Sequence, residues 1–230
     1  MDKSFGFQFT VGLQALLATG LFLSAGLAAA VEEPKFETLL KDGAFELRRY
    51  PALVIAEVVV SGDMDAASNR GFRAIADYIF GNNTAVATGE STSTKIAMTA
   101  PVLTQPVASG PEKIAMTAPV SVEALASNSM AAQQWRVQFV MPSKYQLATL
   151  PKPNNDTVKL REIPARTTAV HTYSWLNSEA RVQQKTDELL AWMQAQKLKG
   201  TGAPQLARYD PPWTLPMWRR NEIQIDTQTP

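Results

Sequence analysis

The octapeptide Lys-Ile-Ala-Met-Thr-Ala-Pro-Val occurs twice without a change, at Lys95–Val102 and at Lys113–Val120. Chance does not plausibly produce such a repeat in a chain of 230 residues, so the two segments meet the same local packing requirement. Apolar residues stand at alternate positions of each copy, and this period of two predicts a pair of β-strands. Pro101 and Pro119 lack a backbone N–H, so we expect them at a strand end, a bulge or a sheet edge. Turn-forming residues between the copies predict a hairpin-like pair.

Outside the repeat, the chain predicts many strands and few helices. Alternating or β-branched runs predict strands at 45–50, 53–61, 134–141, 167–175, 205–209 and 221–226. One helix is expected between Asp63 and Gly81 and a second over Ser178–Gln196, each with an apolar stripe at helical spacing. This content favours an α+β fold in which an antiparallel sheet curls into a barrel with both helices outside.

The first thirty residues have the character of a signal peptide. An uncharged, largely apolar stretch follows Lys3, and Ala28-Ala29-Ala30 supplies the small residues of a cleavage site. We therefore expect a mature chain that starts at Val31 and is exported, to the periplasm or by secretion. The alternative is an uncleaved membrane anchor, because the uncharged stretch is long enough to span a bilayer. A membrane partner is expected only in that case.

Composition limits the classes of function. The formal net charge is +1, which gives no electrostatic reason to expect nucleic acid as a partner. The chain has no cysteine, which excludes disulfides, thiolate catalysis and thiolate-ligated haem. The residues after the leader fit one domain with a sizeable core.

Three sequence blocks resemble those of a known family. They are the repeated octapeptide, the segment Arg208–Pro216 with Arg219–Ile223 after it, and the weaker match Phe45–Pro51. In order and spacing they resemble the signatures of the SOUL haem-binding family, across roughly residues 36–227. The resemblance implies duplicated β-α-β-β units that form a distorted antiparallel β-barrel with two flanking helices.

The resemblance also implies where a ligand would bind. It suggests a shallow apolar cleft for haem or a related tetrapyrrole between the first helix and the C-terminal segment. The residues carried over by position are Phe72, Ile75, Ala76 and Ile79 on the helix, and Trp213, Met217 and Arg219 in the segment. A porphyrin needs apolar walls, which Trp218 can extend, and cations for its propionates, which Arg219 or Arg220 can supply. The alternative is that Arg219–Glu222 forms a structural network that holds the last strand.

Catalytic and metal-binding patterns are weak. The single histidine, His171, is either a haem ligand or a strand residue paired locally, and the second interpretation is preferred. Met98 and Met116 could bind iron or copper, but at mid-strand positions Met mostly fills the core. A triad through His171 lacks an identifiable serine. We therefore predict no catalytic residue and no metal ligand.

The sequence thus predicts an exported, non-enzymatic protein that binds a small-molecule tetrapyrrole reversibly, without a dedicated axial ligand. One alternative is an effector-type barrel for another small apolar or cationic ligand, because the family barrel resembles the ligand domains of some transcription regulators. Another alternative is a protein-interaction module, since one fold accommodates several functions.

Overall fold

The computed structural model describes residues 31–85, 92–107 and 132–228. All of these residues belong to one compact unit, which begins at Val31. The predicted signal peptide and the second copy of the octapeptide therefore lie outside the described residues. No helix in the part of the chain that the structure describes is long and apolar enough to cross a membrane.

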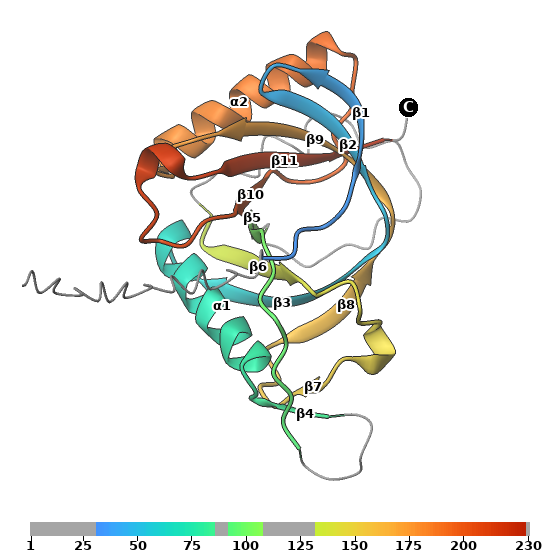
Figure 1. Cartoon of the computed structure of the whole chain (residues 1–230). Helices are drawn as coiled ribbons and strands as arrows, with labels where there is room; N and C mark the ends of the chain where they lie inside the picture. Colours follow the sequence, from blue (N-terminus) through green and yellow to red (C-terminus); the bar gives the residue numbers. More distant parts are fainter. Residues whose placement is uncertain (1–30, 86–91, 108–131, 229–230) are drawn as a thin grey trace, which may run out of the picture. The chain divides into compact units, whose positions relative to one another are not determined.

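A large antiparallel sheet and two helices make up the described domain (Figure 1). The helices are α1 (Met64–Ile79) and α2 (Glu179–Ala195), and the short 3-10 turns are η2 (Leu147–Thr149) and η3 (Pro216–Trp218). The strands of the sheet are β1 (Glu37–Asp42), β2 (Phe45–Tyr50), β3 (Leu53–Ser61), β5 (Val102–Pro106), β6 (Gln134–Val140), β8 (Lys159–Ile163), β9 (Arg166–Tyr173), β10 (Gln205–Arg208) and β11 (Asn221–Thr227). A separate pair consists of β4 (Asn83–Thr84) and β7 (Lys152–Pro153).

Nine strands form the sheet in the order β1-β2-β9-β11-β10-β5-β6-β3-β8. The order is symmetric about the β10–β5 pair, with β9-β11-β10 on one side and β3-β6-β5 on the other. Each helix follows the first strand of its trio in the sequence. The α+β class is thus confirmed, but no ladder within the described ranges joins β1 to β8, so the predicted closure into a barrel is not found. The predicted duplication stays an interpretation of the symmetric strand order.

Local sequence signals account for the helices and the central strands. Asp63 caps α1 by accepting a hydrogen bond from the backbone N–H of Ala66 at 2.8 Å. Ser178 caps α2 in the same way, through the N–H of Arg181 at 3.3 Å. Gly81, just after α1, has a φ of +126°, a backbone conformation that residues other than glycine rarely adopt. The strands predicted at 45–50 and 53–61 are confirmed as β2 and β3.

The first octapeptide copy is not the strand that its pattern predicts. It runs extended without regular pairing, apart from a bridge at Thr99, and β5 begins only at Val102. Ile96 and Met98 nevertheless turn toward the core beneath α1, where Ile96 is buried. The alternating apolar side chains of this segment therefore pack onto the core, but its backbone is largely not hydrogen-bonded as part of a sheet.

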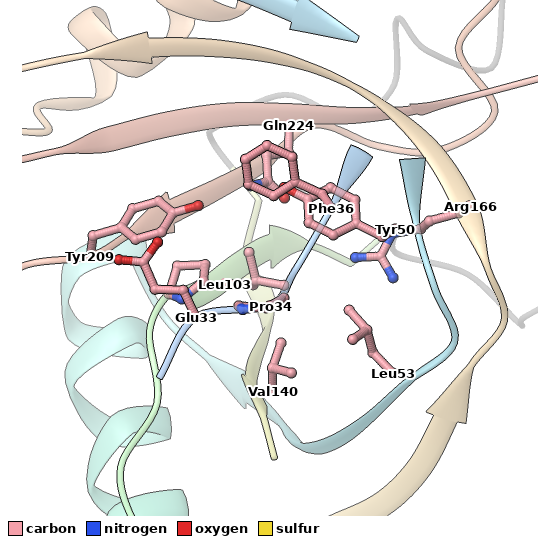
Figure 2. Close-up of a pocket in the computed structure, with 11 residues that line it drawn as sticks. Glu33, Pro34, Phe36, Tyr50, Leu53, Leu103, Val140, Arg166, Tyr209 and Gln224 are labelled. Carbon is pink, nitrogen blue, oxygen red and sulfur yellow. The ribbon is translucent and has the colours of Figure 1, made fainter. Parts of the chain in front are cut away.

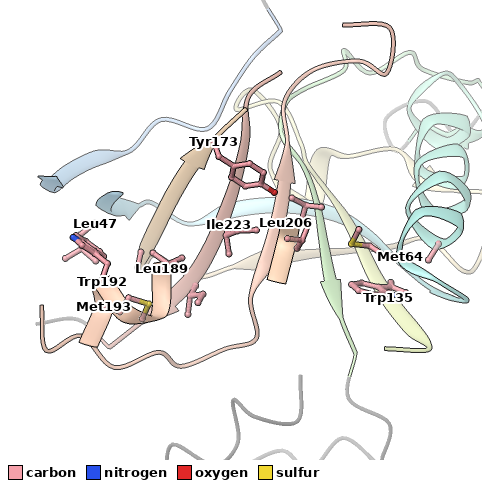
Figure 3. Close-up of a cluster of buried hydrophobic side chains, with 13 residues drawn as sticks. Leu47, Met64, Trp135, Tyr173, Leu189, Trp192, Met193, Leu206 and Ile223 are labelled. Atoms are coloured by element: carbon pink, nitrogen blue, oxygen red, sulfur yellow. The ribbon is translucent and has the colours of Figure 1, made fainter. Parts of the chain in front are cut away.

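Alternation along the strands gives the sheet two different faces. The outer face is apolar and covered by both helices, as Leu47, Ala169 and Ile223 illustrate. One buried cluster joins α2 to β2, β9 and β11 and extends through Leu206 and Trp135 to Met64 of α1 (Figure 3). Another lies beneath α1. The residues between them in sequence, such as Arg48 and Glu222, point to the inner face. On β2 and β11 the inner face is consequently polar and buried, which is unusual for a surface that no helix covers.

Candidate functional site

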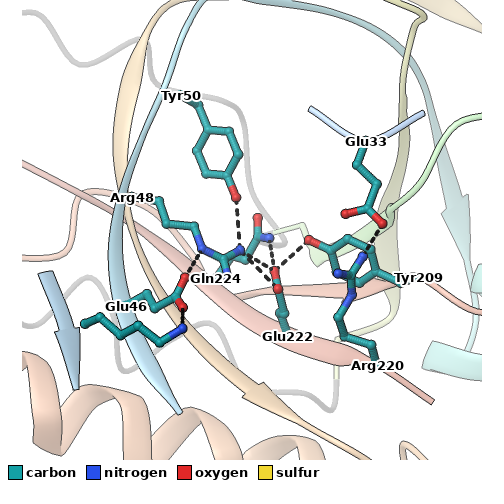
Figure 4. A network of polar contacts seen from close by, with 9 residues as sticks. Glu33, Glu46, Arg48, Tyr50, Tyr209, Arg220, Glu222 and Gln224 are labelled. Atoms are coloured by element: carbon teal, nitrogen blue, oxygen red, sulfur yellow. Dashed lines mark hydrogen bonds and ion pairs between the residues drawn. The ribbon is translucent and has the colours of Figure 1, made fainter. Parts of the chain in front are cut away.

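A network of buried polar side chains lies on the inner face of the sheet (Figure 4). At its centre the guanidinium of Arg48 on β2 donates from Nη1 to both carboxylate oxygens of Glu222 on β11, at 3.0 and 3.1 Å. The Tyr209 hydroxyl and the Gln224 side-chain amide donate to Glu222 Oε2 at 2.7 and 2.8 Å. Only 2% of the Glu222 side chain is exposed, so three neighbours satisfy a carboxylate that has lost its water.

The network extends to both edges of the inner face. The Arg48 Nε donates to Glu46 at 2.6 Å, and Glu46 also pairs with Lys41 at 2.8 Å. On the other side, the Arg220 guanidinium lies 3.6 Å from the centre of the Tyr209 ring and pairs with Glu33. The inner face is therefore a continuous chain of charge-assisted contacts, most of it shielded from water.

Burial and neighbouring charges shift the titration of this network. Burial raises the pKa of the Tyr209 hydroxyl, and the adjacent Glu222 carboxylate raises it further. Burial is the largest single influence on the pKa of Arg48 and would lower it, but Glu222, Tyr50 and Glu46 together outweigh burial, so the pKa of Arg48 lies above its ordinary value. Burial also raises the pKa of Tyr50. These groups keep one protonation state near neutral pH, which suits positioning rather than proton transfer.

A cavity opens beside the network (Figure 2). It is small, with a volume of about 20 Å³, enough for about one water molecule, and its lining combines apolar, aromatic and charged side chains. The lining residues are Glu33, Pro34, Phe36, Tyr50, Leu53, Pro101, Leu103, Val140, Arg166, Tyr209 and Gln224. They come from the N-terminal segment and from strands β2, β5, β6, β9 and β11, so distant parts of the sequence build one site.

The predicted tetrapyrrole contacts on α1 divide into buried and exposed residues. Ile75, Ala76 and Ile79 are buried, and Ile75 and Ile79 pack within the core beneath α1, so they offer no surface to a ligand in this structure. Their stripe faces the sheet because the sheet is the larger apolar surface next to the helix. Phe72 is 37% exposed and its ring is tilted by 49° against that of Phe139, with ring centres 5.5 Å apart. Of the four helix residues, Phe72 alone is available to a ligand.

The predicted C-terminal contacts lie on the surface, in the loop between β10 and β11. Trp213 is 82% exposed and Trp218 is 72% exposed, and Met217 is exposed beside them. The guanidinium of Arg219 is engaged within its own loop, where it donates to the carbonyls of Thr214, at 2.8 Å, and Pro212. Arg219 thus holds the loop in shape, and the ion pair of Arg220 with Glu33 ties the last strand to the N-terminal segment. The structural interpretation of these two arginines fits better than propionate binding.

A second loop enlarges this exposed apolar surface. The backbone N–H of Trp175, at the end of β9, donates to the Pro216 carbonyl at 2.9 Å, which places the two loops side by side. Exposed apolar residues on the two loops form what we call the tryptophan patch: Trp175, Leu176, Trp213, Leu215, Met217 and Trp218. Trp175 has a φ of +93°, which is strained for a bulky residue, and Asn221 donates to its carbonyl at 2.9 Å.

The loop that carries Trp213 starts next to the first turn of α1. Arg208, the last residue of β10, pairs with Asp65 of α1 at 3.3 Å, and the loop that carries Trp213 departs from there. On the outward side of α1, an open hollow is lined by Ala66, Asn69, Arg70, Phe72 and Arg73. The helix and the segment that the family resemblance brings together are thus neighbours.

His171 lies under α2, away from both surfaces. Its ring is tilted by 33° against that of Phe45, with centres 4.3 Å apart. Its Nδ1 lies 3.2 Å from the Lys185 carbonyl oxygen, and its Nε2 lies 3.6 Å from Glu188. Burial lowers the pKa of His171 below its ordinary value. Within the residues placed by the structure, no group of three or more His, Asp or Glu side chains could hold a metal ion. The preferred interpretation of His171 as a locally paired strand residue agrees with this geometry.

Sequence reasoning missed most of the inner-face residues. Arg48, Tyr50, Arg166 and Gln224 were not singled out as a group. A signal was present, because polar residues alternate with apolar ones in β2 and β11, as in Asn-Glu-Ile-Gln-Ile-Asp. Alternation of this kind is ordinarily assigned to a solvent-exposed face, and only the tertiary structure shows that this face is buried.

Comparisons with known proteins agree with the sequence blocks. The profile of the family described as SOUL heme-binding protein matches residues 31–109 and 105–226. The chain therefore belongs to the SOUL haem-binding family. No curated protein sequence matches the chain.

Solved structures show the same fold at low identity. The C-terminal domain of EcmrR is similar with a TM-score of 0.53 at 13% identity, over 81% of this chain and 98% of that one. A protein described as a hydrolase from Listeria innocua is similar with a TM-score of 0.50 at 12% identity, over 83% of this chain and 94% of that one. At these identities the likeness concerns the fold and not the activity.

Proposed function

We propose that this SOUL-family protein binds haem or a related tetrapyrrole on its surface, against the tryptophan patch and the exposed side of α1. The observation that carries the proposal is the tryptophan patch itself. Large aromatic side chains so exposed as Trp213 and Trp218 are uncommon on a protein that has no partner for them. A flat porphyrin is the kind of ligand that family membership points to and that aromatic walls accommodate.

Backbone strain in the patch supports a binding role. A residue held in a sparsely populated conformation costs on the order of 1–3 kcal/mol and persists only where its surroundings impose it. Trp175 is such a residue, and the Asn221 side chain holds its carbonyl. Such strain is frequent at ligand-binding positions, and here it keeps an indole at the surface, beside η3.

The charge distribution suggests how the propionates would be oriented. Arg73, on α1 next to Phe72, is exposed and has no ion-pair or hydrogen-bond partner among the residues that the structure describes. Arg219 is engaged by two backbone carbonyls, and Arg70 by the carbonyl of Ser61. Arg73 is therefore the best candidate to receive a propionate by a charge-assisted hydrogen bond.

Binding would not rely on the histidine as an axial ligand. His171 is buried beneath α2 and directs its ring nitrogens to Lys185 and Glu188. Affinity would come from apolar burial and from Arg73, which is consistent with reversible binding. We further propose that the protein is not an enzyme and that it acts after export, with residues 1–30 as its signal peptide.

A haemin titration of the full chain tests the proposal. We expect a one-to-one shift of the Soret band, and an affinity lowered about tenfold by Trp213→Ala or Phe72→Ala, because each removes an aromatic wall worth roughly 1–1.5 kcal/mol. Phe80→Ala is the matched control, since Phe80 is also an exposed phenylalanine but lies just past the other end of α1. It should leave the affinity within about twofold of the original.

Two results would reject the proposal. One is the absence of a Soret shift with the folded chain. The other is an equal effect of Phe72→Ala, Trp213→Ala and Phe80→Ala, which would mean that haemin adheres to any exposed aromatic residue. Substitutions of Trp218 and Met217 are further tests of the same patch, and each should lower the haemin affinity by the same factor of about ten.

A further inference from the structure

We propose that the tryptophan patch is also a membrane-contacting surface, whose indoles insert between the headgroups and the acyl chains of a zwitterionic bilayer. This inference goes beyond tetrapyrrole binding and does not depend on it. It also differs from the expectation that a membrane is a partner only through an uncleaved leader, because here the folded domain makes the contact.

The two loops of the patch carry no charged side chain. One covers residues 174–178, Ser-Trp-Leu-Asn-Ser, and the other covers residues 211–218, Pro-Pro-Trp-Thr-Leu-Pro-Met-Trp. The second loop lies between β10 and β11 at one end of the sheet (Figure 1), and a backbone hydrogen bond joins it to the first. Together they expose three of the five tryptophans of the chain. Apolar loops without an ion can enter a lipid interface, since no charge has to lose its water.

The indoles of the patch differ from the buried ones in their hydrogen bonds. The two buried tryptophans, Trp135 and Trp192, donate from Nε1 to protein oxygens at 3.0 Å. In the part of the chain that the structure describes, no atom accepts a hydrogen bond from Nε1 of Trp175, Trp213 or Trp218. Each of these indoles thus presents an apolar ring and a free N–H. This combination is typical of tryptophan at membrane–water interfaces, where the ring is in an apolar region and the N–H meets polar groups.

Hydrogen bonds hold both loops in place without a lipid. Arg219 donates to the carbonyls of Thr214, at 2.8 Å, and Pro212, and so fixes the second loop. Asn221 donates to the Trp175 carbonyl at 2.9 Å, which holds the first loop at its positive φ. An apolar surface that is already ordered loses little conformational entropy on binding, and this favours insertion.

The charges beside the loops balance, which favours a zwitterionic surface. Arg219 follows the second loop and Arg181 lies in the first turn of α2, but Asp210 and Glu179 supply one negative charge for each. The other two arginines at the ends of the second loop are already in ion pairs with carboxylates. These groups therefore do not form the net positive patch that directs a protein to anionic headgroups. Attraction to the bilayer comes from the indoles and their apolar neighbours.

The junction with the predicted signal peptide lies beside the same loop. Glu33 pairs with Arg220, which is two residues after Trp218. Ala30 is three residues before Glu33, a distance of about 10 Å in a fully extended chain. Chain connectivity therefore keeps the patch near any membrane that the leader enters, during export or as an anchor.

Tryptophan emission of the full chain, mixed with phosphatidylcholine vesicles, tests this contact. Residues 1–30 contain no tryptophan, so the emission reports the domain even where the leader itself binds lipid. We expect phosphatidylcholine with brominated acyl chains to quench the emission, and unmodified phosphatidylcholine to shift it to shorter wavelength. Leu176→Asp and Leu215→Asp each place a charge in one loop and keep all five tryptophans, so each should lose most of the quenching.

Leu147→Asp is the matched control, because Leu147 is a similarly exposed leucine of η2, outside the patch, and this variant should keep the original quenching. Phosphatidylglycerol in the vesicles should change the quenching less than about twofold, because the charges beside the loops balance. The proposal is overturned by absent quenching, by equal quenching in the three leucine variants, or by quenching that requires phosphatidylglycerol. A patch that binds a protein partner instead would give the first of these results. The vesicle experiment contains no haemin, so a failed haemin titration leaves its result unchanged.

Discussion

Removal of the Arg48 guanidinium is the sharpest perturbation of the inner face. In Arg48→Met the side chain keeps most of its apolar length, but Glu222 loses two of its hydrogen bonds, at 3.0 and 3.1 Å, and its only directly bonded cation. Glu46 loses the contact at 2.6 Å but keeps Lys41. The variant therefore leaves a carboxylate that is 2% exposed without a counter-charge.

The magnitude follows from what remains around Glu222. Breaking a buried ion pair by removing one partner costs about 3–5 kcal/mol in the free energy of unfolding. Tyr209 and Gln224 still donate to the carboxylate, so we expect the lower end, about 3 kcal/mol. For a domain of this size, 1 kcal/mol corresponds to about 2–4 °C, so Tm should fall by about 6–12 °C.

Urea unfolding followed by circular dichroism measures this loss, with two companion variants. Arg49→Met, on the same strand, breaks only an exposed pair with Glu37 and should cost at most about 1 kcal/mol. The double variant Arg48→Met with Glu222→Gln should recover about half of the loss or more, because a buried neutral amide is less costly than a buried unpaired charge. A loss for Arg48→Met no larger than that for Arg49→Met, or a double variant less stable than the single one, would refute the reasoning.

Further predictions concern the helices and the histidine. Gly71→Ala should destabilise by about 1–3 kcal/mol, because the new Cβ would lie 2.5 Å from Val137 Cγ2, and Gly202→Ala, which meets nothing within 4 Å, serves as the control in thermal unfolding. Asp63→Ala should cost about 1 kcal/mol in urea unfolding, through the lost cap of α1, and no loss would contradict the capping geometry. His171 has a folded pKa below its ordinary value of 6.5, so the unfolded state binds more protons and stability should fall as pH drops below that value. In His171→Asn this contribution to the pH dependence of stability, between pH 7 and 5, should disappear. An unchanged dependence of the free energy of unfolding on pH in this variant would contradict the prediction.

Local sequence period predicted both helices and most strands, and missed the edge strands and β5. Strands β3 and β6 and both helices carry apolar residues at spacings that bind them to the core, so their positions follow from the sequence. The strand predicted over the octapeptide instead begins at Val102, as β5. The edge strands β1 and β8 were not predicted, because most of their side chains are exposed or half-buried and alternate little. Edge strands derive much of their order from the neighbour's hydrogen bonds, which leave no trace in composition.

In the candidate sites, too, the sequence predicted some residues and only the structure revealed the others. Trp213 and Met217 were predicted as ligand contacts from sequence blocks, and the structure places them at the surface, where ligand contact stays a prediction. Ile75 and Ile79 were assigned to the same cleft, but they face the sheet, since a helix stripe gives the direction of the apolar side and not what covers it. Arg166 has no distinguishing neighbours in the sequence, so its unsatisfied nitrogen could not be foreseen.

The sequence by itself determined the family, the α+β class, the two helices and the positions of most main strands along the chain, because these depend on motifs and periods within short segments. Only the tertiary structure decided that the alternating polar residues of β2 and β11 meet in a buried network around Arg48 and Glu222. It also decided that the segment Glu33–Phe36 lies over a cavity. Both results depend on strand register and on residues far apart in the chain, which pair only after the sheet has formed.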